Sequence, residues 1–103
     1  MTNLPVYEDL TGSLFVQISA SRLQLGRALF IAAYRSDTRN LEALNLSESI
    51  RVPLGAETLT IVYTLIASAP PEYVAARFKK VGQLEETDSI NILNYIVDIL
   101  AWP

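Results

Sequence analysis

The sequence predicts a mainly α fold, a compact bundle of four or five helices in one domain, and three observations favour it. Polar residues recur at helical spacing over residues 14–34, residues 70–81 open with prolines and an acid, and residues 90–101 are apolar outside one narrow polar arc. A period near 3.6 residues is the main sequence sign of an amphipathic helix. The prediction allows one short strand or hairpin around residues 57–67.

The chain has the size of a single globular domain, residues 1–103, in which residues 1–13 form an extended N-terminal lead-in. Half of its residues are hydrophobic and 18% are charged, whereas ordinary soluble domains carry about 25% charged residues. A domain of this length buries roughly two thirds of its unfolded surface, so it has room for one core. This composition argues against intrinsic disorder.

The first half of the chain is predicted to hold a long helix and then a short one. The polar residues of segment 14–34 and its end share one arc at helical spacing: Gln17, Ser21, Gln24 and Arg35. Residues 14–19 also fit a strand, and Gly26 lowers helix stability by about 1 kcal/mol relative to alanine. A second helix is expected over residues 39–46, with residues 47–55 as a connector.

Residues 57–69 fit two periods. The apolar residues give a helical stripe of Leu59, Val62, Tyr63 and Ile66, and a strand alternation of Leu59, Ile61, Tyr63 and Leu65. Threonine and β-branched content favours a strand, whereas the length of the segment favours a helix because strands usually run about 4 to 8 residues. We prefer the helix here and expect any strand in the fold to occur in this segment.

The last third of the chain is predicted to form two helices. Residues 70–81 begin with prolines, which a first helical turn tolerates, and would end at Gly82. Residues 90–101 follow Asp88 or Ser89 as the cap. The polar residues of this last helix occupy a narrow arc: Asn91, Asn94 and Asp98.

The predicted helices over residues 14–34 and 90–101 are both apolar nearly all round. Together they carry more apolar surface than one small core covers easily. Burying one leucine or isoleucine contributes about 1.5–3 kcal/mol, so a few exposed side chains favour association. The alternative is that the last helix is central to the monomer's own core. The residues predicted to contact a partner are Phe15, Leu23, Phe30, Tyr34, Ile92, Tyr95, Ile96, Ile99 and Trp102.

The residue types present argue against catalysis. The chain has no cysteine and no histidine, which excludes disulfides, thiolate or imidazole chemistry and Cys/His zinc sites. Glu85, Glu86 and Asp88 form an acidic cluster that could bind a divalent cation or act in acid/base chemistry. Acids just before a helix are better explained by capping and the helix dipole. We therefore expect a protein that is not an enzyme, with no catalytic residue, cofactor or metal.

Nucleic acid is a poor partner for this chain. Its net charge is −3, and binding to phosphate backbones depends on clustered lysine and arginine. The nearest approach to such a cluster is a basic and aromatic group made of Tyr73, Arg77, Phe78, Lys79 and Lys80. A solvated helix end explains those cations more simply.

The sequence therefore predicts a non-catalytic protein–protein interaction or assembly subunit. It would form a homo-oligomer or dock into a larger complex, such as a virion or multi-subunit assembly. The alternative is a small acidic regulatory adaptor or inhibitor that binds and blocks another protein. The longest apolar run, residues 28–34, is shorter than the ~20 residues of a membrane span. With no secretory signal visible, we expect a cytoplasmic location or a place in an assembled particle.

Overall fold

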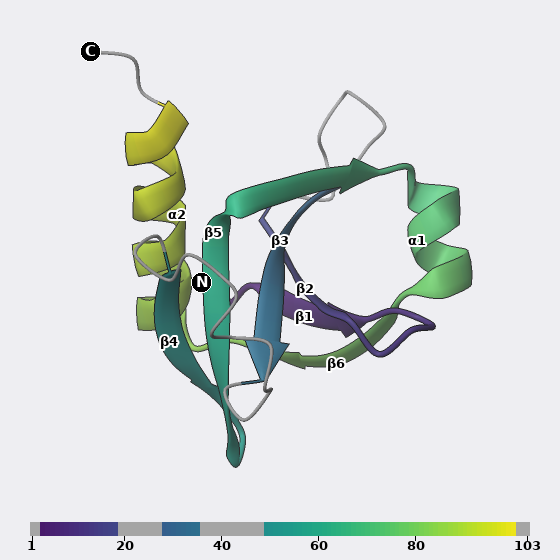
Figure 1. Cartoon of the computed structure of the whole chain (residues 1–103), viewed down its shortest axis with the longest axis horizontal. Coiled ribbons are helices and arrows are strands. Elements are labelled where there is room, and N and C mark those ends of the chain that lie inside the picture. The colour runs from purple at the N-terminus through teal and green to yellow at the C-terminus, as the bar shows by residue number, and fades with distance from the viewer. Residues whose placement is uncertain (1–2, 19–27, 36–48, 101–103) are drawn as a thin grey trace.

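The computed structural model describes residues 3–18, 28–35 and 49–100, and this part of the chain is mostly β (Figure 1). The strands are β1 (Pro5–Glu8), β2 (Leu14–Gln17), β3 (Ala28–Arg35), β4 (Ser49–Leu54), β5 (Glu57–Ala69) and β6 (Lys79–Gln83). The helices of the described part are α1 (Pro71–Arg77) and α2 (Glu86–Leu100). The predicted bundle of four or five helices is therefore wrong.

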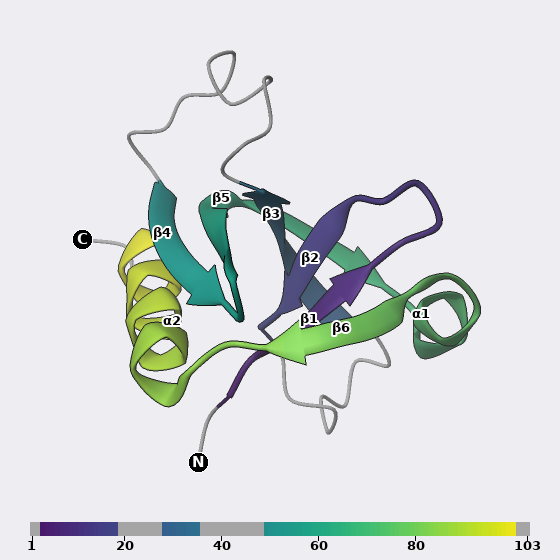
Figure 2. The ribbon, with the colours of Figure 1, turned by 90° about the horizontal axis from the view of Figure 1, so that it is seen from below.

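The six strands form one curled antiparallel sheet in the order β4-β5-β3-β2-β1-β6. Figure 2 shows the sheet curving from β4 round to β6, with α2 beside β4 at the open side of the curl. The two edge strands approach each other at Gly82, where an added Cβ would lie 2.9 Å from Leu54 Cδ1. The absence of a side chain at Gly82 thus lets the edges of the curl come close.

The register of the strands separates an aliphatic face from an aromatic face. Val6 pairs with Val16, which pairs with Ile31, and cross-strand partners point to the same side of a sheet. Neighbouring positions in each strand, such as Tyr7 and Phe15, point to the other side. The aliphatic side chains form the core together with α2: Leu4, Val6, Leu14, Val16, Ile31, Ala33, Val52, Leu59, Ile61, Leu84, Ile92 and Ile96.

The last helix is confirmed as a helix, but it starts at Glu86, so Asp88 and Ser89 lie in its first turn rather than before it. Ser89 is fully buried; its Oγ accepts a hydrogen bond from the Leu4 amide at 3.0 Å and donates one to the Glu85 carbonyl at 2.8 Å. Ile92 and Ile96 project into the core. The start of the helix is therefore fastened to the N-terminal segment of the chain.

The predicted helix over residues 14–34 is wrong, because β2 and β3 occupy the described parts of this segment. Leu14 and Val16 are buried on the aliphatic face, while Phe15 is half-buried on the aromatic face. Since both faces take apolar residues, the strand period does not appear as an alternation of polar and apolar residues. The helix predicted over residues 39–46 lies outside the described residues.

The helix preferred for residues 57–69 is also wrong, because the whole segment is β5. Ile31 of β3 pairs with Ile66, but the next residue, Ala32, pairs with Val62, so residues 63–65 have no partner in β3. Such an insertion bends a strand, and Figure 1 shows β5 turning sharply along its length. The first part of β5 pairs with β4 and β3, and the part after the bend pairs with β3. β5 therefore pairs with its neighbours on both sides of its bend, which explains why it is longer than the other strands.

The helix predicted to open at Pro70 is confirmed, but it ends at Arg77 instead of Val81. The Phe78 amide donates to the Val74 carbonyl at 2.9 Å and is the last residue tied to the helix. Lys79–Gln83 then pairs with β1 as strand β6. Pairing with an available sheet edge overrides the helical propensity of these residues.

Candidate functional site

Aromatic rings gather on the sheet face that points away from the aliphatic core. Strand register places Tyr7, Phe15 and Phe30 on this face, and Phe78 joins them from the end of α1. Phe15 and Phe78 are stacked, with centroids 5.3 Å apart and an interplanar angle of 8°. Phe30 meets Phe78 edge to face at 5.0 Å and 69°. The rings thus form a packed cluster with several orientations.

Next to this cluster lies a cavity of about 410 Å³, here called the aromatic pocket. Its walls are four aromatic rings, the end of β5 together with Pro70 (residues 67–70), and Asp9; the rings are Phe15, Phe30, Tyr73 and Phe78. Ala67 and Ser68 on its wall are exposed, and Tyr73 is 44% exposed. The pocket is therefore a surface site open to a binding partner.

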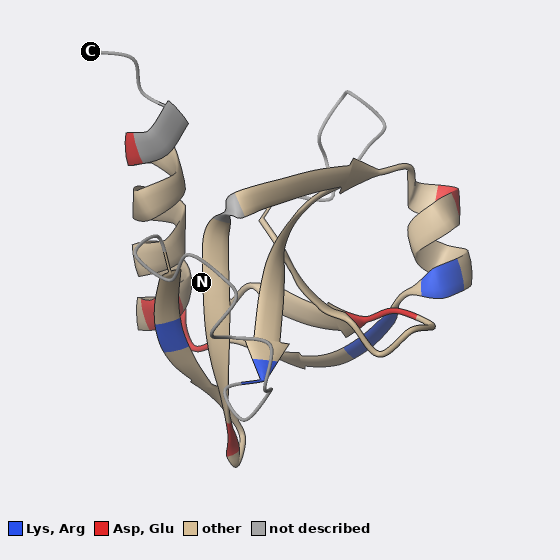
Figure 3. Ribbon diagram, viewed as in Figure 1, with Lys and Arg blue, Asp and Glu red and all other residues tan. Residues whose placement is uncertain are grey.

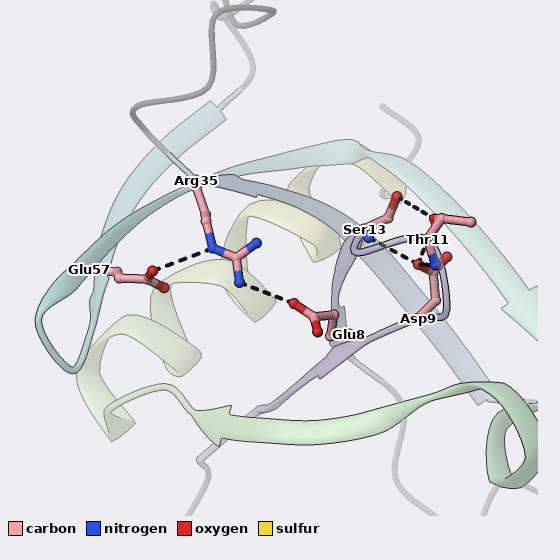
Figure 4. A network of polar contacts seen from close by, with 6 residues as sticks. All are labelled: Glu8, Asp9, Thr11, Ser13, Arg35 and Glu57. Carbon is pink, nitrogen blue, oxygen red and sulfur yellow. Dashed lines mark hydrogen bonds and ion pairs between the residues drawn. The ribbon is translucent and has the colours of Figure 1, made fainter.

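Asp9 is the charged residue of the pocket and is held by the turn between β1 and β2. Its Oδ1 accepts hydrogen bonds from the Thr11 amide at 2.9 Å, the Thr11 hydroxyl at 2.7 Å and the Ser13 amide at 2.9 Å (Figure 4). Gly12 supplies the positive φ of 84° that this turn needs. The hydrogen bond from the Thr11 side chain is the largest of the effects that lower the pKa of Asp9. Asp9 thus remains a fixed negative charge at neutral pH.

A second polar group joins three strands at one end of the curl (Figure 4). Arg35 of β3 donates from Nη2 to Glu8 of β1 at 3.1 Å and from Nε to Glu57 of β5 at 3.4 Å. The hydrogen bond to Glu8 is the main cause that raises the pKa of Arg35. Another cavity of about 410 Å³, lined by residues 11–15 and 32–35, lies beside this arginine. Because Arg35 is already paired with two carboxylates, this cavity offers a ligand less uncompensated charge than the aromatic pocket does.

The acidic and basic clusters found in the sequence do not build further sites. Glu86 and Asp88 lie in the first turn of α2, where the helix dipole favours acids. Over the described residues, no three acidic residues gather as a metal site would require. Arg77 ends α1, whereas Lys79 lies on β6, so these cations do not share one helix end. Figure 3 shows acidic and basic residues interspersed over the described ribbon rather than gathered by sign.

The structure brings together two of the predicted contact residues and separates the others. Phe15 and Phe30 meet in the aromatic pocket, and Tyr34 is half-buried on the same strand as Phe30. Ile92 and Ile96 are buried in the core, as the alternative of a central last helix expects. Tyr95 is exposed and stacks on Tyr63 at 5.2 Å. Three predicted positions fall outside the described side chains: Leu23, Ile99 and Trp102.

Sequence reasoning missed Asp9 and placed Tyr73 and Phe78 in a different group. A signal for Asp9 was present, because an aspartate followed by Thr11 and Gly12 is a common turn sequence. Tyr73 and Phe78 belong to the connection between β5 and β6, and the sheet order alone decides that this connection lies against β2 and β3. No local pattern could show that position.

The comparisons with known proteins assign no function, so the functional proposal rests on the aromatic pocket. No protein-family model matches the sequence. A search among curated proteins found no significant match. Neither helix of the described part combines the length and the apolar character that crossing a bilayer requires.

Proposed function

We propose that this chain is a non-catalytic protein-interaction subunit that docks a partner protein through the aromatic pocket. The observation that carries this proposal is a cavity of about 410 Å³ walled by four aromatic rings and open to solvent at Tyr73. Aromatic side chains are enriched at protein interfaces, where they anchor binding. The exposed wall at Ala67 and Ser68 suits a side chain presented by a protein surface better than an enclosed small molecule.

The charges of the site support binding rather than proton transfer. The pKa of Asp9 is lowered by its turn hydrogen bonds, and the pKa of Arg35 is raised by its carboxylate partners. Both shifts keep the group in its ordinary charged state near neutral pH. A general acid or base needs the opposite direction, toward a pKa near the working pH.

Further exposed apolar side chains support a role in assembly. They lie on three elements, β5, β6 and α2, and on the β1–β2 turn: Leu10, Leu65, Ile66, Val81, Ile90, Tyr95 and Val97. Apolar side chains on several sides are typical of a subunit with more than one neighbour. A homo-oligomer or a larger complex, in the cytoplasm or in an assembled particle, is the form that this proposal favours.

The second candidate function is a small acidic adaptor or inhibitor, and the two edge strands favour it. Lys79 and Lys80 occupy β6, which also carries a bulge opposite the Val6/Tyr7 step, and Pro53 interrupts the amides of β4. Lysine, bulges and proline are the features that block pairing between sheet edges. Pairing of either edge strand with a second copy of the chain is thus disfavoured. A monomer that binds one partner protein is consistent with such protected edges.

Selection from a displayed library of random peptides tests the proposed function directly. The folded wild-type chain is the bait, and Tyr73→Ala is the counter-selection bait, because α1 contains no buried residue whose loss would unfold the chain. Tyr95→Ala is the matched control, since Tyr95 has nearly the same exposure on another helix. We expect enriched peptides that bind wild type and Tyr95→Ala but not Tyr73→Ala. Absence of such peptides would contradict the pocket as a docking site.

Light scattering across a concentration series separates the two candidate functions. A discrete oligomer supports the assembly subunit, because self-association then persists without any other partner. A monomer at every concentration supports the adaptor or inhibitor. If an oligomer forms, Tyr73→Ala and Tyr95→Ala are measured beside wild type, which shows whether the pocket contributes to the contact between copies.

A further inference from the structure

Resting on the proposed function, we propose that the aromatic pocket receives a positively charged side chain, arginine or lysine, of the partner protein. The inference joins two features of the pocket. One is a set of aromatic rings at several orientations, and the other is the carboxylate residue Asp9 in the same lining. Together they match an alkyl chain that ends in a cation.

The ring geometry suits a cation with an apolar stem. Phe78 makes contacts at centroid distances of 5.3 Å with Phe15, 5.0 Å with Phe30 and 6.1 Å with Tyr73. The interplanar angles of these contacts range from 8° to 73°, so the rings around the cavity do not share one plane. Methylene groups pack on such surfaces, and a cation within about 6 Å of a ring face is attracted by the ring quadrupole.

The chain already places one cation on a ring of the pocket. The Arg77 guanidinium carbon lies 5.0 Å from the centroid of Tyr73. Arg77 does not line the cavity, so within the described residues it leaves the pocket itself available. The contact shows that a guanidinium lies over this ring in the folded protein.

Asp9 supplies the charge that an incoming cation would meet. Three hydrogen bonds to Oδ1 fix the carboxylate in the β1–β2 turn. The Thr11 and Ser13 donors all reach Oδ1, and a carboxylate has acceptor capacity on its second oxygen for a further donor. A charge-assisted hydrogen bond from an ammonium or guanidinium group is stronger than a neutral one.

Other occupants fit the pocket less well. A purely apolar side chain would remove water from the Asp9 carboxylate without replacing its hydrogen bonds, which is unfavourable. An anion would meet both the carboxylate and the negative faces of the rings. A cationic side chain satisfies the carboxylate and the rings at once.

Titration of the ¹⁵N-labelled full chain with capped tripeptides tests the inference by NMR. The probes are acetyl-Gly-Xaa-Gly-amide with arginine, lysine, citrulline or norleucine at the central position. Citrulline is the uncharged isostere of arginine, and norleucine keeps the stem of lysine without its charge. We expect arginine and lysine probes to shift the amides of Asp9, Phe15 and Tyr73, with the neutral probes about three- to tenfold weaker.

Two variants isolate the role of Asp9. Asp9→Asn keeps the acceptor oxygen of the turn and removes the charge, so we expect it to weaken the cationic probes to the level of the neutral ones. Glu72→Gln removes one exposed carboxylate of α1 that does not line the pocket, and should leave the titration unchanged.

If norleucine binds as well as lysine and Asp9→Asn has no effect, the cationic occupant is wrong while the pocket survives as a docking site. If no probe shifts the pocket amides, the cationic occupant is also wrong, and the peptide selection alone then decides the proposed function.

Discussion

The aliphatic face of the curled sheet is closed by α2, whereas α1 covers the aromatic face only in part. On the aliphatic side, Ile92 of α2 is completely buried. On the aromatic side, α1 contributes no buried residue, and the ring of Tyr73 stays open to solvent. The same sheet therefore carries one finished core and one surface with an open cavity.

The two helices differ in the same way. α2 has fifteen residues and enters the core, whereas α1 has seven. A helix of that length has little stability of its own, so ring contacts such as those of Phe78 with Phe15 and Tyr73 help to hold it in place. The comparison suggests that α2 holds the fold together and that α1 shapes the pocket. Substitutions on the two sides should separate these roles.

Substitution in the core should give the largest loss of stability. Ile92→Ala leaves a cavity where α2 meets the aliphatic face, and we expect it to lower the free energy of unfolding by about 2–5 kcal/mol. Val97→Ala, on the same helix but 62% exposed, should change it by less than about 0.5 kcal/mol. Urea denaturation followed by circular dichroism measures both. Equal effects of the two substitutions would show that α2 does not enter the core as the structure has it.

The polar contact inside the core should have the next largest effect. Ser89→Ala removes the oxygen that accepts the Leu4 amide at 3.0 Å. A buried donor left without a partner costs about 1–3 kcal/mol. Ser13→Ala is the control, because its hydroxyl lies in the exposed turn. Denaturation should show a clear loss for the first variant and little change for the second, and hydrogen exchange of the Leu4 amide should accelerate in Ser89→Ala.

On the aromatic face, stability and binding should separate. Tyr73→Ala removes an exposed ring and its contact with Arg77, which is worth less than about 1 kcal/mol at an exposed site. Binding of pocket-specific peptides should be lost in the same variant. Urea denaturation combined with a binding assay makes the comparison. A large loss of stability with binding retained would reverse the roles assigned to α1 and α2.

The sequence predicted the helices at the C-terminal end because their signals are local. Prolines and Glu72 mark the start of α1, and the long apolar pattern around Ile92 marks α2. The sheet was not predicted, because an apolar residue is favoured on both of its faces. Phe15 packs with aromatic rings and Val16 with the core, so the two are adjacent apolar residues in the sequence with opposite surroundings.

The sequence predicted no pocket, although it singled out two residues that line it. Phe15 and Phe30 were selected for their apolar character, but they were assigned to one helix instead of two paired strands. They come close because Gln17 pairs with Phe30 in the β2–β3 register. Their meeting with Tyr73 depends on the bend in β5 and on the order of the strands. Contacts of this kind are tertiary, and no short-range pattern specifies them.

The turn that holds Asp9 should give the smallest effect, and its sign depends on pH. The folded-state pKa of Asp9 lies below the ordinary 3.8, so its charge stabilises the fold above that pH, and this stabilisation is lost as the pH falls through the lowered pKa. Because the turn is exposed, the loss of stability in Asp9→Asn should be below about 1 kcal/mol at neutral pH. The difference from wild type should shrink in urea titrations below pH 3.8, with Glu72→Gln as the control carboxylate on α1. A difference that grows on acidification would mean that the turn prefers a neutral side chain, and Asp9 would then not be the fixed charge that the aromatic face presents to a partner.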